Sequence, residues 1–352
     1  MLRFYKALAN SEMKVYSHFM VSTQKDARTV LSDPRFSNRQ ELKRPQLPTA
    51  RPNDASQPAA PGWFIHMDPP RHTHYRRLLQ GQFTARRMRL LEPRIERIAA
   101  ELIDGMITHG PPVDLVSAFA LPLPSRVICE LLGVPYADHA FFESNSTAMV
   151  YGSQQAVADL TGYLRDLIDG KEPGDDLISG LKAEVTVEEL TNIALILLVA
   201  GHETTAAMIS LGVDTLLRHP EQDRSDPVEE LLRHLTIVRV GAPNRAALEE
   251  VQLDERTVAA GETVTIDLLA ANHDPAVFTD PHTLRLDRPE AREHLAFGYG
   301  AHLCLGHNLA RLELRIAYRA LFEAFPALRH AGEPRPRAGY PIATLEELPV
   351  AW

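Results

Sequence analysis

One long apolar segment, residues 187–217, constrains the fold of this chain more than any other feature. It follows Thr186, which begins the sequence T-V-E-E-L. The threonine hydroxyl and the carboxylates that follow it predict a capped helix start. Pro220 predicts the stop. About thirty residues at ~1.5 Å each would make a helix about 45 Å long. Because its middle is apolar on nearly every side, we expect it to cross the protein interior.

The rest of the chain predicts a mainly α fold with small β-sheets. Apolar residues recur at three- and four-residue spacing in many segments, and strand-like alternation is confined to short stretches. The helical stretches are 72–83, 85–107, 125–134, 156–170, 226–235 and 305–325, and the strand-like ones are 13–22 and 251–266. No repeat or clear linker divides the chain, so we expect a single domain over residues 1–352.

Composition excludes several classes of protein. The 352 residues carry 37 basic and 46 acidic side chains, a net charge of −9, which disfavours a nucleic-acid partner. Only two cysteines are present, so a disulfide scaffold is excluded. The longest apolar run, 193–200, is shorter than the ~18 residues of a membrane span. With no secretory signal pattern at the start, we expect a cytoplasmic protein with no membrane partner.

The most specific motif surrounds Cys304, just before an amphipathic helix. Two glycines precede the cysteine, Gly298 and Gly300, and Gly306 follows it. A thiolate at a helix N-terminus is stabilised by the helix dipole and by free backbone N–H groups. Glycines permit a tight loop and the close approach of a flat ligand. Cys129, inside an apolar helix, is interpreted as a core residue instead.

The sequence from Phe297 to Gly306 resembles the cysteine-ligand loop of the cytochromes P-450, the haem-thiolate monooxygenases. The similarity extends from 33–37 to 348–352. It implies haem b as the cofactor, with Cys304 as the axial ligand of the iron. It also implies that Phe297, Gly298, His302 and Gly306 contact the haem.

A second motif, A-G-H-E-T-T, lies in the middle of the long apolar helix. Polar groups buried there need a partner or a purpose. A purely structural alternative is a kink in which Thr204 bonds back to a carbonyl one turn earlier. The resemblance implies a functional role: Ala200 and Gly201 leave room for dioxygen beside the haem, while Glu203 and Thr204 deliver protons.

Further motifs gain meaning from the same resemblance. His72, Arg76 and Arg245 match the residues that bind the haem propionates, together with His302. Glu230 and Arg233 match a structural buttress of the cysteine loop. The third member of that buttress is often an arginine, and Thr283 is aligned with it here. The substitutes that we consider are Arg285, Arg288 and His282.

Other departures from the family pattern predict a compact member. The N-terminus is short, the stretch of roughly 142–186 that forms the substrate lid is short, and the connection from 220 to 230 is trimmed. The expected pocket walls are the proline-rich loop 44–66 with Trp63 and Phe64, and the segments 197–200, 238–243 and 342–343. All of them except the loop are largely apolar.

These expectations predict a monooxygenase that hydroxylates a largely apolar small molecule, such as an intermediate of secondary metabolism. No flavin or iron–sulfur module is visible, so a separate ferredoxin or flavodoxin is implied as the electron donor. The candidate docking residues are Arg76, Arg77, Arg86, Arg87, Arg89 and Arg311. The short lid suggests a large substrate or one presented by a carrier protein.

Three alternatives remain open at this point. One is oxidative coupling, or peroxide-driven oxidation, of a carrier- or peptide-bound substrate. Another is a haem sensor or carrier without turnover. The last is a helical structural protein whose motifs are accidental. The Glu203–Thr204 pair argues against peroxide use and against the sensor, because neither needs proton delivery to dioxygen.

Overall fold

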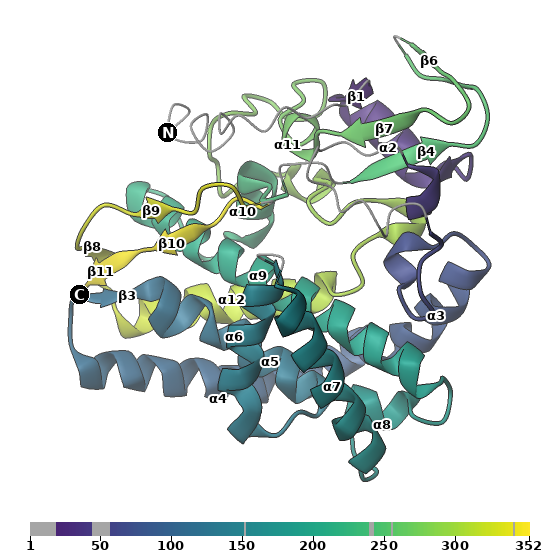
Figure 1. Ribbon diagram of the computed structural model, residues 1–352. Helices are drawn as coiled ribbons and strands as arrows, with labels where there is room; N and C mark the ends of the chain where they lie inside the picture. The colour runs from purple at the N-terminus through teal and green to yellow at the C-terminus, as the bar shows by residue number, and fades with distance from the viewer. Residues whose placement is uncertain (1–18, 44–56, 151–152, 239–242, 255, 341) are drawn as a thin grey trace.

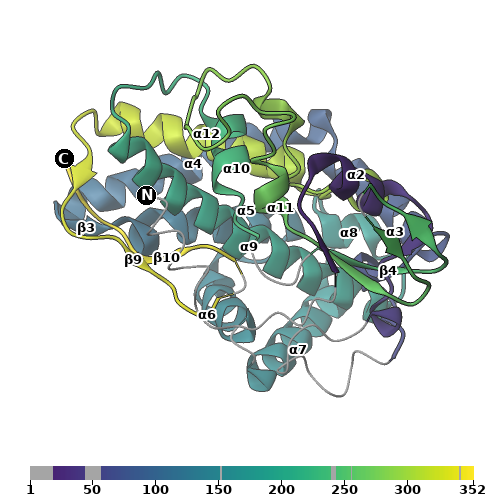
Figure 2. The ribbon, with the colours of Figure 1, turned by 90° about the horizontal axis from the view of Figure 1, so that it is seen from above.

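The computed structural model describes residues 19–43, 57–150, 153–238, 243–254, 256–340 and 342–352. Long helices packed around α9 make up most of it (Figures 1 and 2). The large helices are α4 (Ala85–His109), α5 (Pro122–Leu132), α6 (His139–Val150), α7 (Gln154–Gly170), α9 (Val187–Arg218) and α12 (His307–Ala324). The expected fold class, mainly α with small sheets, is confirmed.

Helix α9 begins as the sequence predicts. The Thr186 hydroxyl accepts from the backbone N–H of Glu189, whose carboxylate accepts from the N–H of Thr186 at 2.9 Å. By length and composition α9 is apolar enough to cross a membrane, but 78% of its apolar 18-residue window is buried inside the protein. It is therefore the central core helix, as its all-round apolarity predicts.

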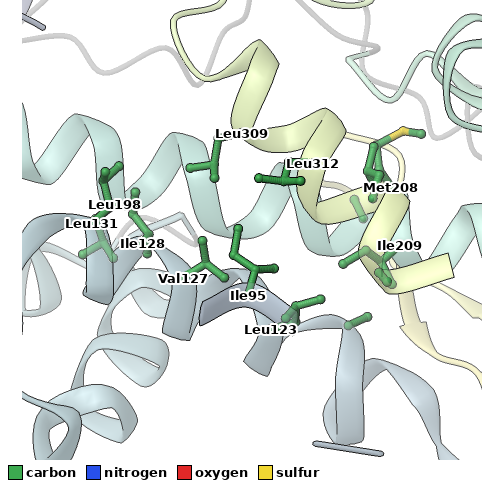
Figure 3. Close-up of a cluster of buried hydrophobic side chains, with 14 of the residues drawn as sticks. Ile95, Leu123, Val127, Ile128, Leu131, Leu198, Met208, Ile209, Leu309 and Leu312 are labelled. Atoms are coloured by element: carbon green, nitrogen blue, oxygen red, sulfur yellow. The ribbon is translucent and has the colours of Figure 1, made fainter. Parts of the chain in front are cut away.

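The principal core forms where α9 meets its neighbours. Figure 3 shows Ile95 of α4, Ile128 of α5, Leu198 and Ile209 of α9, and Leu309 of α12 converging on one apolar cluster. This cluster extends from residue 59 to residue 350. A second, smaller cluster, which includes Val21, Val264 and Leu268, is separate from it. The single domain and the short lid remain predictions.

A four-stranded sheet lies at one end of the molecule, beside α2 (Gln24–Ser32) (Figure 1). Its strands are ordered β1 (Phe19–Val21), β7 (Thr263–Ile266), β4 (Asn244–Ala247) and β2 (Phe36–Ser37). The antiparallel pairing of β2 with β4 sets Ser37 opposite Ala246. This register brings the residues after β2 close to Arg245, although about two hundred residues separate them in the chain.

Smaller sheets lie at the opposite end (Figures 1 and 2). One contains β3 (Val113–Asp114), β11 (Pro349–Ala351) and β8 (Arg329–His330), and another pairs β9 (Arg335–Pro336) with β10 (Leu345–Glu347). The turn between β9 and β10 folds inward, where the N–H of Ala343 donates to the carbonyl of Ile237 at 2.7 Å. The remaining two-stranded sheet, β5 (Val251–Gln252) with β6 (Thr257–Val258), lies instead at the end of the four-stranded sheet (Figure 1).

Shorter helical elements lie between these helices and strands, together with several 3-10 turns. The helical elements are α3 (Arg71–Gln80), α8 (Leu177–Leu181), α10 (Val228–Leu235), α11 (Leu268–Ala271) and a π-helical turn, Val116–Ala120. The expected strand over 13–22 is described only from Phe19 onward. Most of the proline-rich loop, residues 44–56, lies outside the described residues.

Candidate cofactor and active site

The cysteine loop is a tight turn that only glycine permits at two positions. Gly298 and Gly300 both have φ of +72°. A Cβ on Gly300 would lie 2.7 Å from the carbonyl oxygen of Leu31, so a side chain there would collide with α2. The N–H of Cys304 donates to the carbonyl of Phe297 at 2.9 Å and closes the loop. The predicted motif therefore holds one sulfur in a fixed place.

Cys304 faces a hollow rather than the packed core. Its side chain is exposed, although protein atoms surround it closely enough to affect its ionisation. Burial raises the pKa of the thiol, against the opposing effects of the Gly306 N–H and the charges of Arg76 and Arg311. The backbone N–H of Gly306 thus favours the thiolate, in the expected direction, but burial outweighs it in the protein without a ligand. A bound metal ion deprotonates a thiol outright.

Open space adjoins the sulfur at Gly306. This residue is the N-cap of α12, and a Cβ built on it would meet no protein atom within 4 Å. The glycine is thus not required for packing against protein. An open face beside an accessible sulfur is what a flat ligand above the first helical turn needs.

Helix α3 brings two predicted residues to this hollow. Arg76 Nη2 donates to the carbonyl of Leu303, next to Cys304, at 2.6 Å. His72 is buried, and its ring lies 4.0 Å from the ring of His302, centroid to centroid. Within the described part of the chain, the buried Nδ1 of His72 has no hydrogen-bond partner. His72, Arg76 and His302 therefore meet in space, as the resemblance implies.

Arg245 belongs to the same cluster, which includes two residues that sequence reasoning missed. Arg245 Nη1 and Lys43 Nζ donate to the same oxygen, Asn38 Oδ1, at 2.9 and 2.6 Å. The amide nitrogen of Asn38 lies 3.4 Å from Nδ1 of His302. The basic character of residues 39–44 was the available signal for Lys43, but only the sheet register places it beside Arg245.

The cluster gathers several basic side chains in a buried place, where burial and mutual repulsion disfavour their charged forms. Burial, followed by neighbouring positive groups, lowers the pKa of Lys43 to about 7, of His72 to about 4 and of His302 to about 2. Burial also lowers the pKa of Arg245 to about 10. Buried cations of this kind normally have anionic partners. The arrangement fits a cofactor with carboxylate groups.

Together these residues fit a haem. The hollow offers an accessible thiol, an open glycine face, an orphaned buried nitrogen on His72 and a cationic cluster for carboxylates. A cavity of 690 Å³ adjoins the cluster on the side of His66, Arg245 and His302. The site contacts of Phe297, Gly298 and Gly306 with the cofactor remain predictions.

The polar motif of α9 does not break the helix. Thr204 Oγ1 donates back to the carbonyl of Ala200 at 2.6 Å, which is the bond that the structural alternative predicts. Gly201 has a packing reason of its own, since a Cβ there would lie 3.2 Å from Ile128 Cδ1 of α5. Ala200 and Thr204 are both accessible, one turn apart. They therefore lie on one open face of the helix.

Glu203 is buried on a different side of α9. Its side chain is 5% exposed, and Oε2 lies 3.8 Å from Nη1 of Arg337, in the turn between β9 and β10. His202 is also buried and lies against α6, with Nδ1 2.9 Å from Ser146 Oγ. Sequence reasoning did not anticipate Arg337, because nothing in the pattern indicates which turn reaches the middle of α9.

The buttress of the cysteine loop is complete, but its third member differs from the alignment. Glu230 accepts from Arg233 at 2.7 Å and from Arg288 at 3.1 Å, and all three side chains are fully buried. Thr283 contributes only its carbonyl, which accepts from Arg288 Nη2. Of the substitutes considered for Thr283, Arg288 is therefore the one that occupies the position.

Comparisons with known proteins decide the family. Residues 226–347 match the model of the cytochrome P-450 family. The chain is 44% identical to pentalenic acid synthase of Streptomyces avermitilis, over 96% of this chain and 89% of that one. It is 43% identical to vitamin D3 dihydroxylase of Streptomyces griseolus, over 95% and 87%. This chain belongs to the cytochrome P-450 family.

Solved structures of the family agree with the fold. The mycinamicin VIII C21 methyl hydroxylase of Micromonospora griseorubida, bound to mycinamicin VIII, superposes with a TM-score of 0.88 at 36% identity. The superposition covers 99% of this chain and 96% of that one. This cytochrome P-450 is accordingly an oxidoreductase and monooxygenase of the haem-thiolate type.

Proposed function

We propose that this cytochrome P-450 uses dioxygen to hydroxylate a largely apolar small molecule, an intermediate of secondary metabolism. We further propose haem b as the cofactor and a separate ferredoxin or flavodoxin as the electron donor, in the cytoplasm. The named activities of the relatives, a methyl hydroxylase and a dihydroxylase among them, support this class of reaction.

The cofactor would be held from several elements of the fold. Cys304 would supply the axial sulfur, and the cluster of His72, Arg76, Arg245 and His302 would bind the carboxylates. The bound haem supplies the oxygen-activating and C–H-oxidising chemistry, which the protein directs by placing and protecting it. The hollow beside Gly306 would hold the ring.

The observation that carries the proposal is the placement of an acid and an alcohol on neighbouring positions of α9. Thr204 keeps its hydroxyl on the accessible face beside Ala200, anchored by the 2.6 Å bond. Glu203 is buried next to it and lies near Arg337. The two side chains lie on different sides of α9, and together a shielded acid and an accessible hydroxyl would hold protons and pass them toward the open face. A peroxide-driven enzyme or a haem sensor has no need of such a pair.

The candidate docking arginines divide into two groups. Arg76 donates to Leu303, Arg87 pairs with Asp175 at 2.6 Å, and Arg311 pairs with Glu229 at 2.6 Å. Arg77, Arg86 and Arg89 are exposed. We propose these three exposed residues as the docking charges, because partners already neutralise or occupy the others.

A comparison of two oxidant systems tests the function. The purified enzyme would be given a panel of apolar natural-product intermediates with NADPH, a ferredoxin system and isotopically labelled dioxygen. Hydroxylated product carrying one labelled oxygen is expected, and Glu203→Gln should lose most of it. With hydrogen peroxide instead, which already carries the electrons and protons, Glu203→Gln should retain the wild-type rate. Equal loss with both oxidants would contradict the assigned role of Glu203.

A further inference from the structure

Lys43 lies in the cationic cluster although nothing in the family resemblance pointed to it. It follows a short 3-10 turn, Gln40–Leu42, and its ammonium donates to Asn38 Oδ1 at 2.6 Å. Arg245 donates to that same oxygen at 2.9 Å. Two cations from opposite ends of the sequence thus share one neutral oxygen. A neutral amide balances no charge, so this pair lacks a matching anion at the oxygen it shares.

The charged groups around Lys43 do not supply that anion. Of the nearby carboxylates, Glu41 pairs with Arg39 at 2.7 Å, and Asp68 is held by the N–H of Asn38 at 2.8 Å and by the hydroxyl of Ser37. Asp68 favours the charged forms of Lys43 and Arg245, but among the described residues neither carboxylate forms an ion pair with either cation. The remaining groups that face Lys43 are Arg245 from β4, His66 from the 3-10 turn before α3, and His302 from the cysteine loop.

The ionisation of the cluster shows the same imbalance. Burial and then the charge of Arg245 lower the pKa of Lys43 to about 7, against the smaller raising effects of Asp68 and Glu41. Nδ1 of His66 is buried without a hydrogen-bond partner among the described residues. A carboxylate placed beside a buried lysine raises its pKa and so favours its charged form.

We propose that Lys43 is a haem-binding residue, and that with Arg245 it holds one carboxylate of the cofactor. His72 and Arg76, which come from α3, are left for the other carboxylate. This inference rests on the proposed haem b, which carries two carboxylates. It also gives the chain segment after β2 a direct role in retaining the cofactor.

The rate of haem loss tests the proposal without reference to turnover. Ferric holoenzyme would be mixed with excess apomyoglobin and the transfer followed in the Soret band. A charge-assisted hydrogen bond contributes ~1.5–3 kcal/mol, so Lys43→Gln should lose haem at least about tenfold faster. Lys43→Arg keeps the charge and should stay within about twofold of wild type. Lys25→Gln, at an exposed pair with Asp254, is the matched control and should not change the rate.

A modified cofactor separates binding from a merely structural role. The proteins would be loaded by exchange with the dimethyl ester of haem, which has no carboxylates. The difference between wild type and Lys43→Gln should then disappear. Lys43→Met, which keeps the apolar stem, replaces the glutamine variant where that variant fails to fold.

Two results would overturn the proposal. One is haem loss from Lys43→Gln at the wild-type rate; the other is an equal acceleration with haem and with its ester. A wild-type protein that binds no haem at all would instead overturn the proposed function, so the two failures are distinguishable.

Discussion

Arg288 places its Nε 3.1 Å from Oε2 of Glu230, and both side chains are fully buried. The same guanidinium donates to the carbonyl of Thr283 at 2.9 Å and so ties the segment before the cysteine loop to α10. Arg233 completes the group on the other side of the carboxylate at 2.7 Å. The glutamate is therefore the common partner of two buried arginines.

Removal of Arg288 should destabilise the protein strongly. Breaking a buried pair typically costs ~3–5 kcal/mol, and because Arg233 remains we expect Arg288→Ala to cost about 3 kcal/mol. Urea unfolding of the haem-loaded protein measures the change. Arg285→Ala is the control, since that side chain is 42% exposed and lies 3.5 Å from Asp287. A cost for Arg288→Ala as small as that of the control would contradict the buttress.

A second buried acid makes stability depend on pH. Burial alone would raise the pKa of Glu229, but the neighbouring His294 and Arg311 hold it down, from 4.5 to about 2. Because the pKa in the folded state is below the unfolded value, the stabilisation is fully present above pH 4.5 and is lost as the pH falls toward 2.

Substitution of Glu229 should remove this dependence. We expect Glu229→Gln to be about 3 kcal/mol less stable at pH 7 and to lose correspondingly less stability between pH 4.5 and 2. Denaturant unfolding at several pH values provides the measurement. Parallel losses in wild type and variant over that range would show that Glu229 does not carry the effect.

Substitution of two glycines of the cysteine loop should have different effects, one on stability and the other on haem binding. Gly300→Ala would strain a residue at φ +72° and press a Cβ to 2.7 Å from Leu31, so we expect ~1–3 kcal/mol lower stability. A Cβ on Gly306 would point into open space, so we expect Gly306→Val to fold normally but to bind little haem. Circular dichroism on heating reports the fold, and the ratio of Soret to protein absorbance reports the haem. Full haem content in Gly306→Val would contradict the placement of the ring.

Arg337 lies 3.8 Å from Glu203 and should help to position its carboxylate. A general acid typically contributes ~10²–10⁴-fold to the rate. Arg337→Ala should disturb the alignment of Glu203, and we expect it to lower the product formed per NADPH consumed by about tenfold. Substrate-induced spin-state changes should be unaltered, because the proposed role of Arg337 is exerted through Glu203 alone. The control, Arg335→Ala, removes only pairs with the exposed Glu346 and Glu347. Equal coupling in the two variants would refute the positioning role.

The sequence predicted the features that depend on neighbouring residues in the chain. The start of α9 at Thr186 and the tight loop before Cys304 follow from capping chemistry and from glycine conformations. The proximity of His72 to Arg76 follows from their four-residue spacing on one helix. Each depends on residues close together in the chain.

Contacts between distant segments were beyond such signals. Asn38 and Arg245 meet because β2 pairs with β4, and no local pattern specifies that register. Sequence position aligned Thr283 with the buttress arginine. In the structure the arginine that reaches Glu230 is Arg288, five residues later, because the loop between them brings it there. The cationic surplus around Lys43 likewise emerges only once those segments are packed together.

The absorption spectrum of the purified protein, reduced with dithionite and exposed to carbon monoxide, tests the central claim most directly. The account predicts a strongly red-shifted Soret band of the thiolate type, which Cys304→Ala lacks. A histidine-type band, or no haem band at all, would contradict the assignment of Cys304 as the ligand of a haem.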